Sequence, residues 1–202
     1  MMTNIIIETK DITLYRNDSK IFEGISLDIE KTKLLNIFGR NGSGKTSLLK
    51  ILTGVTEPTS GIVLNRSDDE TLYEKIIYVG HKSGLKNNLT VNENLYYFIK
   101  PEEQNKTTKI DRALEIYQMM HCKNILVKNL SHGQQKKVSL MKTIIADAKV
   151  WILDEPYSAL DAESIKIFDM TIENYVKQEG SVVVTNHKKI TENSWSKNYQ
   201  LN

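Results

Sequence analysis

A glycine-rich segment of the chain has the residue types that hold phosphate groups. It reads GRNGSGKT and runs from Gly39 to Thr46. Glycines let the backbone curl closely around an anion, so that successive N–H groups point at phosphate oxygens. The ammonium of Lys45 can reach the β and γ phosphates of a nucleoside triphosphate, and the hydroxyl of Thr46 can ligate magnesium. The residues expected to bind the nucleotide here are Gly39, Arg40, Asn41, Gly42, Ser43, Gly44, Lys45, Thr46 and Ser47.

Two neighbouring carboxylates follow a second apolar run, the residues VWIL. Asp154 would emerge at the carboxyl edge of a strand, where α/β sheets place ligand chemistry, and it is expected to hold magnesium through water. Glu155 is displaced enough to leave the metal and to polarise an attacking water toward the γ phosphate as general base. An isolated acidic pair would more simply open a turn, and Pro156 would in any case stop the strand. The expected cofactors are therefore ATP and Mg²⁺.

The segments around these residues alternate between strand and helix. Leu27 and Ile29 alternate with polar residues, as in a half-solvated antiparallel strand, whereas residues 34–38 form a nearly continuous apolar run typical of a buried parallel strand. Apolar residues then recur at helical spacing from 48 to 52, and Gly54 suits the left-handed cap that ends a helix. The glycine-rich loop is thus expected between a buried strand and a helix.

The middle of the chain, between about 90 and 148, has a helical pattern. One helical face is predicted to carry Ile110, Leu114, Tyr117 and Met120, and another Val138, Met141, Ile144 and Ile145. The β-rich runs 150–153 and 182–184 flank an amphipathic stretch marked by Ile165, Phe168, Ile172 and Tyr175. Strand and crossover helix return in this way in parallel sheets, so the pattern predicts an α/β fold with a mainly parallel sheet.

The composition limits the classes of partner. Lysine and arginine number 27 against 25 acidic residues, so the net charge of +2 provides no broad field for binding nucleic acid or anionic lipid. No run of about 18 apolar residues occurs, so we expect no direct membrane insertion. The start, MMTNIIIETKD, lacks the pattern of an export signal. Cys122 is the only cysteine, which fits a reducing compartment.

Three further stretches, LSHGQQKK, WILDEP and SALD, follow one another in an order that resembles the signature, Walker B and D-loop sequences of ABC ATPases. The resemblance implies a P-loop NTPase fold of the ABC ATPase type, with an antiparallel β subdomain and a helical subdomain at about 88–148, inserted in a single nucleotide-binding domain spanning 1–202. It also implies a homodimer in which the signature addresses the γ phosphate held by the opposite subunit. The signature residues are Ser131, His132, Gly133 and Gln134. Ser131 is also a good helix N-cap, and it could be no more than that.

The same resemblance assigns roles to other positions. Tyr15 corresponds to the aromatic residue that stacks on adenine, although it could be a plain surface tyrosine. Ser158 and Asp161 correspond to the D-loop that links the two sites across the dimer. His187 corresponds to the switch histidine that contacts the γ phosphate, although a lone histidine often satisfies only local hydrogen bonds.

Two histidines depart from the usual ABC pattern. His81 stands where a Q-loop glutamine is usual; it could still ligate water or metal, but its protonation would make that contact depend on pH. His132 replaces the central glycine of the signature, where its side chain could point away harmlessly or weaken the composite site. Both departures leave open a nucleotide-sensing module that does not hydrolyse ATP.

The phrase GHKSGLKNNLTVNENL narrows the family further. Together with LSHGQQ and WILDEP, it resembles the ATPase subunits of cytochrome c maturation transporters. That resemblance implies an integral membrane subunit as partner, a peripheral location at the cytoplasmic face of the bacterial inner membrane, and a role in heme export or heme-chaperone handling. Residues 96–98, YYF, could line the docking groove for this partner or pack inside the helical insertion. The alternative is a soluble ABC-type ATPase that serves cofactor or protein assembly without a transporter.

Overall fold

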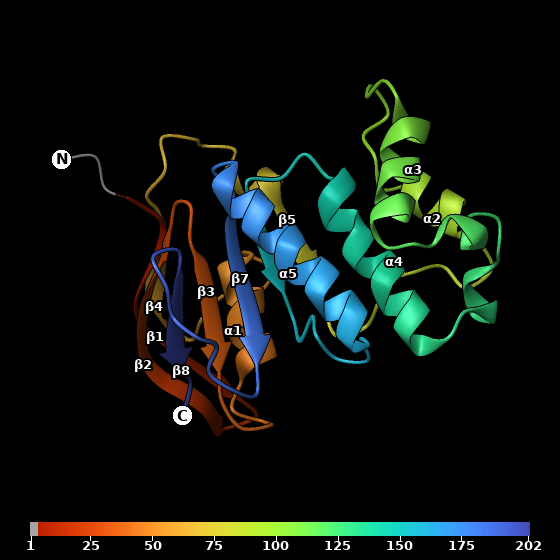
Figure 1. The fold of residues 1–202 in the computed structure, drawn as a ribbon. Helices are drawn as coiled ribbons and strands as arrows, with labels where there is room; N and C mark the ends of the chain where they lie inside the picture. Colours follow the sequence, from red (N-terminus) through yellow and green to blue (C-terminus); the bar gives the residue numbers. More distant parts are fainter. Residues whose placement is uncertain (1–3) are drawn as a thin grey trace. The chain divides into compact units, whose positions relative to one another are not determined.

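The computed structural model describes residues 4–202, and helices and strands alternate along them (Figure 1). The chain forms two compact units. The first comprises residues 4–78, 148–155 and 173–202, and the second comprises residues 79–147 and 156–172. The prediction of one domain with a helical insertion at about 88–148 stays a prediction.

An antiparallel sheet in the first unit has the strand order β2-β1-β4. The strands are β1 (Ile5–Arg16), β2 (Ser19–Glu30) and β4 (Ser60–Asn65), and β1 pairs antiparallel with both neighbours. Leu27 and Ile29 of β2 are buried while Asp28 between them is exposed, as the alternation of residue types predicts. The antiparallel part of the predicted fold class is therefore confirmed.

A five-stranded sheet has the order β5-β6-β7-β3-β8. Its strands are β3 (Leu34–Phe38), β5 (Ile76–Val79), β6 (Val150–Leu153), β7 (Ser181–Asn186) and β8 (Ser196–Gln200). β3 pairs in parallel with β7 and β8, and β6 pairs in parallel with β7. The ends of β3, β6 and β7 therefore lie at one edge of the sheet, which is where the predicted phosphate and carboxylate residues follow their strands.

Helix α1 (Lys45–Leu52) follows β3 and begins where the glycine-rich loop ends. Its apolar residues are fully buried in one cluster with residues of β1, β2 and β3. They are Leu48, Leu49, Ile51 and Leu52. Burial of such side chains contributes about 1.5–3 kcal/mol each, which fixes the start of the helix under the loop. Gly54 has φ 72°, as predicted for a residue that ends the helix in a left-handed conformation.

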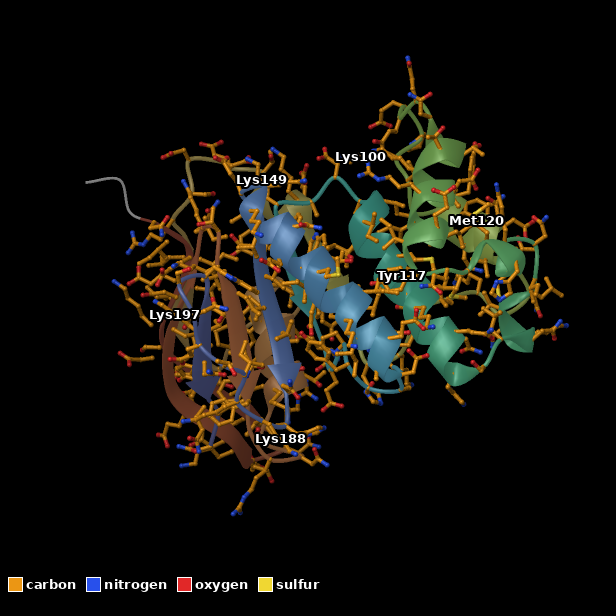
Figure 2. The ribbon with its side chains drawn as sticks, viewed as in Figure 1. Lys100, Tyr117, Met120, Lys149, Lys188 and Lys197 are labelled. Atoms are coloured by element: carbon orange, nitrogen blue, oxygen red, sulfur yellow. The ribbon has the colours of Figure 1, made fainter. Side chains whose placement is uncertain are left out.

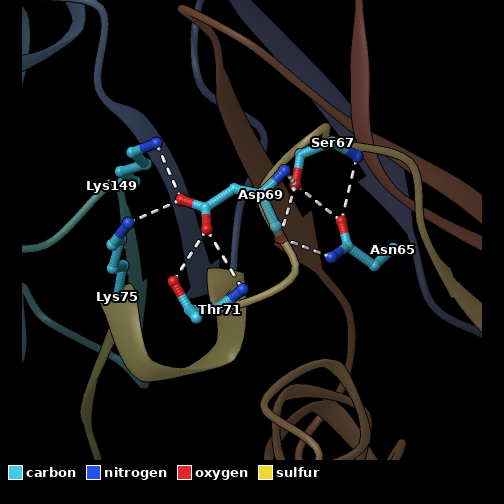
Figure 3. A network of polar contacts seen from close by, with 6 residues as sticks. All are labelled: Asn65, Ser67, Asp69, Thr71, Lys75 and Lys149. Carbon is cyan, nitrogen blue, oxygen red and sulfur yellow. Dashed lines mark hydrogen bonds and ion pairs between the residues drawn. The ribbon is translucent and has the colours of Figure 1, made fainter.

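A carboxylate in the first unit ties the segment after β4 to the start of β6 (Figure 3). Oδ2 of Asp69 accepts hydrogen bonds from Nζ of Lys75 at 2.7 Å and of Lys149 at 2.8 Å, and Oδ1 accepts from the Thr71 hydroxyl at 2.7 Å. Lys75 belongs to a short 3₁₀ turn, η1 (Leu72–Lys75), and Lys149 directly precedes β6. The hydrogen bonds from Lys149, Lys75 and Thr71 hold the pKa of Asp69 well below its ordinary value.

The second unit is helical. Its helices are α2 (Val91–Tyr96), α3 (Lys106–Ile116), α4 (His132–Ile145) and α5 (Ala162–Lys177) as far as Ile172, with short 3₁₀ turns η2 (Met120–Cys122) and η3 (Val127–Asn129). Within residues 4–202, no helix combines the length and the apolar composition needed to cross a membrane.

The predicted buried face of α3 is confirmed at three of its four residues and wrong at the fourth. Ile110, Leu114 and Tyr117 are buried, whereas Met120 is 42% exposed. The helix ends at Ile116, and Gln118 takes a left-handed conformation with φ 56°. Met120 therefore lies in the separate turn η2, out of register with the helix (Figure 2).

Candidate functional site

The glycine-rich loop, residues 39–44, passes from β3 to α1 in a path that excludes larger side chains. Gly44, the N-cap residue of α1, has φ 93°, and a Cβ atom there would lie 2.7 Å from Cγ2 of Ile21 and 2.8 Å from Cδ1 of Phe22. A Cβ atom on Gly39 would collide with the carbonyl oxygen of Leu201. The loop thus needs glycine at both positions, and it ends at the first N–H groups of α1, which have no partner within a helix.

The first residue of α1 places a cation against the loop. Lys45 is buried, and its ammonium donates to the carbonyl oxygens of Gly39 at 2.9 Å and Arg40 at 3.0 Å. The hydroxyl of Ser43 is buried and has no hydrogen-bond partner among residues 4–202. A pocket of about 650 Å³ lies against the loop and is also lined by His187 and residues 200–202. A curled backbone with a helix N-terminus and a lysine is suited to holding phosphate oxygens.

Asp154 lies at the carboxyl end of β6 and is held from two sides. Its Oδ2 accepts a hydrogen bond of 2.6 Å from the Thr46 hydroxyl, and its Oδ1 accepts one of 2.7 Å from the Thr185 hydroxyl. The side chain is almost completely buried. Burial, together with the nearby charge of Asp154, raises the pKa of Tyr78 to about 12. The structure thus brings together Thr46 and Asp154, the two residues that the sequence predicts as magnesium ligands.

The backbone at Glu155 turns away from the extended conformation of β6. Its φ is 46°, a left-handed conformation that costs a non-glycine residue about 1–2 kcal/mol. The Thr185 hydroxyl accepts a hydrogen bond of 2.8 Å from the Glu155 N–H and thereby supports this turn. Oε1 of Glu155 lies 3.5 Å from Nε2 of His187, which directly follows β7. The predicted general base and the predicted switch histidine are therefore neighbours.

Thr185 is a residue of the site that the sequence analysis does not single out. It is fully buried in β7 and contacts both Asp154 and the backbone of Glu155. Its place follows from the pairing of β6 with β7, in which Leu153 lies opposite Val184. The signal in the sequence is the hydroxyl in the run SVVVTN, but it becomes informative only when the partner strand is known.

Tyr15 lies near the end of β1 in the antiparallel sheet, and its ring is exposed. Its backbone N–H donates to the Thr59 hydroxyl at 3.0 Å. The exposed ring is free to contact a planar ligand, and its pairing with adenine stays a prediction.

The signature residues begin helix α4 in the second unit. Ser131 is the N-cap, and it forms a reciprocal capping box with Gln134. The Gln134 N–H donates to the Ser131 hydroxyl oxygen at 3.2 Å, and the Ser131 N–H donates to Oε1 of Gln134 at 2.9 Å. The capping function is present as predicted, and the Ser131 hydroxyl accepts here, so its hydrogen can be donated elsewhere. His132 is exposed in the first turn of the helix.

The segment that holds the predicted D-loop residues lies against the start of the same helix. A Cβ atom on Gly133 would lie 2.8 Å from the carbonyl oxygen of Ala159, so the two backbones touch. Asp161 accepts hydrogen bonds from the Ser164 hydroxyl at 2.6 Å and the Ser164 N–H at 2.7 Å. Its other oxygen lies 3.4 Å from Nζ of Lys137, and the Ser164 contacts foremost lower the pKa of Asp161. Ser158, also predicted for the D-loop, is exposed.

His81 lies in the second unit, in the exposed loop that follows β5. Two buried side chains of α4 hold this loop two residues further on. The Ser139 hydroxyl and the Lys142 ammonium each donate to the carbonyl oxygen of Ser83 at 3.0 Å. Burial lowers the pKa of Lys142. The loop of His81 and the helix of Ser131 are therefore joined by contacts that the sequence analysis did not identify.

Comparisons with known proteins identify the family of this chain. A family model described as "ABC transporter" matches residues 22–158. The chain is 32% identical over 189 residues to the "Cytochrome c biogenesis ATP-binding export protein CcmA" of Vibrio cholerae, with 91% of each chain covered. It is 30% identical over 190 residues to the Escherichia coli protein of the same name, covering 92% of this chain and 90% of that one.

Solved structures show the same fold. A dimeric ATP-binding cassette in a post-hydrolysis state, bound to ADP and Pi, aligns with a TM-score of 0.78 at 22% identity, covering 91% of this chain and 88% of that one. The five-stranded sheet, the antiparallel sheet and the helices are thus those of ABC ATPase domains. The chain belongs to the ABC transporter family, as an ATPase subunit that resembles the cytochrome c biogenesis ATP-binding export proteins.

Proposed function

We propose that the chain hydrolyses Mg²⁺-bound ATP at sites shared between two copies and couples this reaction to a membrane partner in cytochrome c biogenesis. The observation that carries the proposal is the 2.6 Å contact between the Thr46 hydroxyl and Oδ2 of Asp154, beside the cationic phosphate loop. It supports a site in which a hydroxyl and a carboxylate oxygen converge next to phosphates.

The residues fit the binding of ATP and magnesium. Residues 39–47 hold the phosphates through backbone N–H groups, and Lys45 exchanges its two carbonyl partners for phosphate oxygens. Magnesium is held in proteins by one or two carboxylates or hydroxyls plus substrate phosphates and water, which suits the pair Thr46 and Asp154. When bound, the metal neutralises charge on the transferring phosphate. Tyr15 stacks on adenine.

Hydrolysis needs a group that orients the attacking water. Glu155 carries that role as general base, because its left-handed backbone turns it out of the strand end beside the magnesium ligand. His187, whose Nε2 lies 3.5 Å from Oε1 of Glu155, contacts the γ phosphate. His81 contacts water or metal in place of the usual Q-loop glutamine. The roles of Glu155, His187 and His81 can each be tested by substitution and measurement of ATP hydrolysis.

A second copy completes the site. The signature residues 131–134 of one copy address the γ phosphate held by the other, and the D-loop residues Ser158 and Asp161 link the two sites. The capped start of α4 supports this arrangement, since a helix N-terminus carries partial positive charge that stabilises an anion. The similar solved cassette is dimeric, which also supports a homodimer.

The pathway rests on the names of the relatives, which describe cytochrome c biogenesis and export. An integral membrane subunit is the expected partner, and it holds the chain at the cytoplasmic face of the bacterial inner membrane. The cargo is heme or a heme-chaperone complex. Tyr96, Tyr97 and Phe98 at the end of α2 are exposed, Tyr97 to 77%, which favours docking of this partner over packing within the unit.

The substitution Lys45→Ala tests the phosphate site. Removal of the ammonium is expected to reduce ATP affinity by at least about 100-fold, since a charge-assisted contact to phosphate is lost. Circular dichroism should show a folded protein. Lys50→Ala, on the same helix, serves as the matched control. Wild-type ATP affinity and turnover in Lys45→Ala would contradict the proposed binding of phosphate by Lys45.

Purification in mild detergent tests the membrane partner. A tagged chain expressed from its native locus is expected to retain an integral membrane subunit, and Tyr97→Asp is expected to release it while leaving ATP binding intact. A chain that associates only with soluble proteins would instead indicate an assembly ATPase without a transporter.

A further inference from the structure

An asparagine is buried in the middle of the strand that carries the phosphate loop. Asn36 belongs to β3, whose other residues are apolar, and its exposure is 0%. Its Oδ1 is buried and has no hydrogen-bond partner among residues 4–202. A buried polar atom without a partner is destabilising, so an apolar residue of similar size would suit the core of the sheet better. The contribution of this amide must lie in the groups that it holds.

The amide of Asn36 holds the chain directly after His187. Its Nδ2 donates to the carbonyl oxygen of Lys188 at 3.1 Å and to Oδ1 of Asn198 at 2.7 Å. Asn198 lies opposite Asn36 on β8, as the strand register requires. Both hydrogens of the Asn36 amide are therefore used to join β3 with β8 and with the segment after β7.

Asn198 extends the hold to the rest of that segment. Its Oδ1 accepts from the Ile190 N–H at 3.0 Å, and its Nδ2 donates to the Ile190 carbonyl oxygen at 2.9 Å. The ammonium of Lys189 also lies 5.5 Å from the centre of the Phe38 ring, on the same strand as Asn36. Lys188 and Lys189 thus contact β3, and Ile190 contacts β8, although the segment itself is neither helix nor strand.

We infer that Asn36, with Asn198, is a positioning residue for His187. The His187 side chain is half exposed and lies 3.5 Å from Glu155, so the path of its backbone decides where the imidazole stands. β3 leads into the phosphate loop at one end and contacts Lys188 and Lys189 through Asn36 and Phe38. Ile190 is held by Asn198 on β8, which in turn accepts a hydrogen bond from Asn36. Strand β3 therefore positions both the phosphate loop and the segment that follows the proposed switch histidine. The inference rests on the proposed role of His187 in hydrolysis.

A double-mutant cycle tests the inference. Asn36→Leu is expected to lower kcat for ATP hydrolysis about tenfold, since small misplacements of a reacting group cost such factors, while ATP affinity stays within about twofold. In a His187→Ala background the same substitution is expected to change kcat by less than about twofold, because the group it positions is absent. An equal reduction of kcat in both backgrounds would overturn the inference, because a general loss of structure acts without His187.

A second variant and a control keep the test decisive. Asn198→Ala removes the same connection from a half-buried position at the sheet edge, and it is expected to reproduce both results if Asn36→Leu folds poorly. Asn65→Ala is the control, because Asn65 holds a loop through the same kind of bond, to the Asp69 carbonyl oxygen at 2.8 Å, on β4. It is expected to leave kcat unchanged.

Hydrogen exchange gives a readout that does not depend on turnover. The Ile190 N–H is expected to exchange faster in Asn198→Ala and Asn36→Leu than in the wild-type chain, and equally fast in Asn65→Ala and wild type. Unchanged exchange at Ile190 in both variants would contradict the proposed hold. If His187→Ala alone hydrolyses ATP at the wild-type rate, the proposed role of His187 in hydrolysis is wrong. The cycle distinguishes this result from one in which His187 is needed but Asn36 does not position it.

Discussion

The hydroxyl of Thr46 donates a hydrogen bond of 2.6 Å to Oδ2 of Asp154, although the two residues are 108 positions apart in the sequence. Thr46 stands in the first turn of α1 and Asp154 directly after β6. β6 lies two strands from β3 in the sheet, separated by β7 alone. The parallel arrangement thus brings a hydroxyl and a carboxylate together at the edge where the phosphate loop begins.

Replacement of Thr46 by valine is expected to reduce ATP hydrolysis by about 10²-fold, because the branched shape remains while the oxygen is lost. The dependence of nucleotide affinity on magnesium should weaken in the same variant. Thr46→Ser keeps the oxygen and should retain most of the activity. Titration of hydrolysis and binding with magnesium measures both effects, and a valine variant with wild-type magnesium dependence would exclude Thr46 as a ligand.

Thr185→Val is expected to lower both stability and turnover. The hydroxyl donates to Asp154 and accepts from the Glu155 N–H, so the isosteric valine leaves two buried polar groups without this partner. The free energy of unfolding should fall by about 1–3 kcal/mol, measured with urea, and kcat should fall about tenfold. Thr185→Ser is the matched control. A valine variant that loses stability but keeps the wild-type kcat would show that Thr185 supports the sheet and not Glu155.

Gly133→Ala is expected to impair hydrolysis without impairing ATP binding by the single chain. The added Cβ atom would lie 2.8 Å from the Ala159 carbonyl oxygen, closer than van der Waals contact allows, so the signature and D-loop backbones must separate. Lys128→Ala, an exposed change just before the signature, is the control for unspecific effects. Equal hydrolysis rates in Gly133→Ala and wild type would mean that this close approach has no part in the reaction.

The ion pairs of Asp69 predict how stability depends on pH (Figure 3). The pKa of Asp69 is lower in the folded chain than in the unfolded chain, where about 3.9 is expected, so the unfolded state binds more protons between the two values. The stabilisation by Asp69 is therefore complete above about pH 4 to 5 and is lost as pH falls through the folded value. Asp69→Asn should be less stable than wild type in urea at pH 7, and the difference should shrink as pH falls below about 4. A difference that stays constant from pH 7 to 3 would contradict the role of the charge.

Local patterns predicted much of the fold because the elements concerned are specified by their own residues. The apolar run that ends at Phe38, the helical spacing after Lys45 and the glycine at position 54 each determine their structure within a few positions. The prediction for Met120 is wrong because helical spacing continues in the sequence past Ile116, with neither glycine nor proline to mark the break. The left-handed residue Gln118 donates its side-chain amide to Glu163 at 2.9 Å, 45 positions further along the chain, and no local pattern predicts such a contact.

Some residues of the site lie in local sequence motifs, and others are brought to the site only by strand pairing. The phosphate loop, the acidic pair after β6 and the cap at Ser131 have recognisable local motifs, so the sequence predicts their positions. Thr185 and Asn36 have no local motif. The contacts of a single polar residue in an apolar strand depend on which strands lie beside it. The register that places Thr185 near Asp154 and Asn36 opposite Asn198 arises when the sheet forms.

The shared site between two copies is tested most directly by sedimentation of the Glu155→Gln chain with ATP and magnesium. This variant should bind ATP, fail to hydrolyse it, and shift from monomer to dimer only when ATP is present. Adding Ser131→Ala to the same chain should prevent the shift while leaving ATP bound. A Glu155→Gln chain that stays monomeric with ATP bound, combined with a wild-type hydrolysis rate per chain that does not change with protein concentration, would contradict a site completed by a second copy.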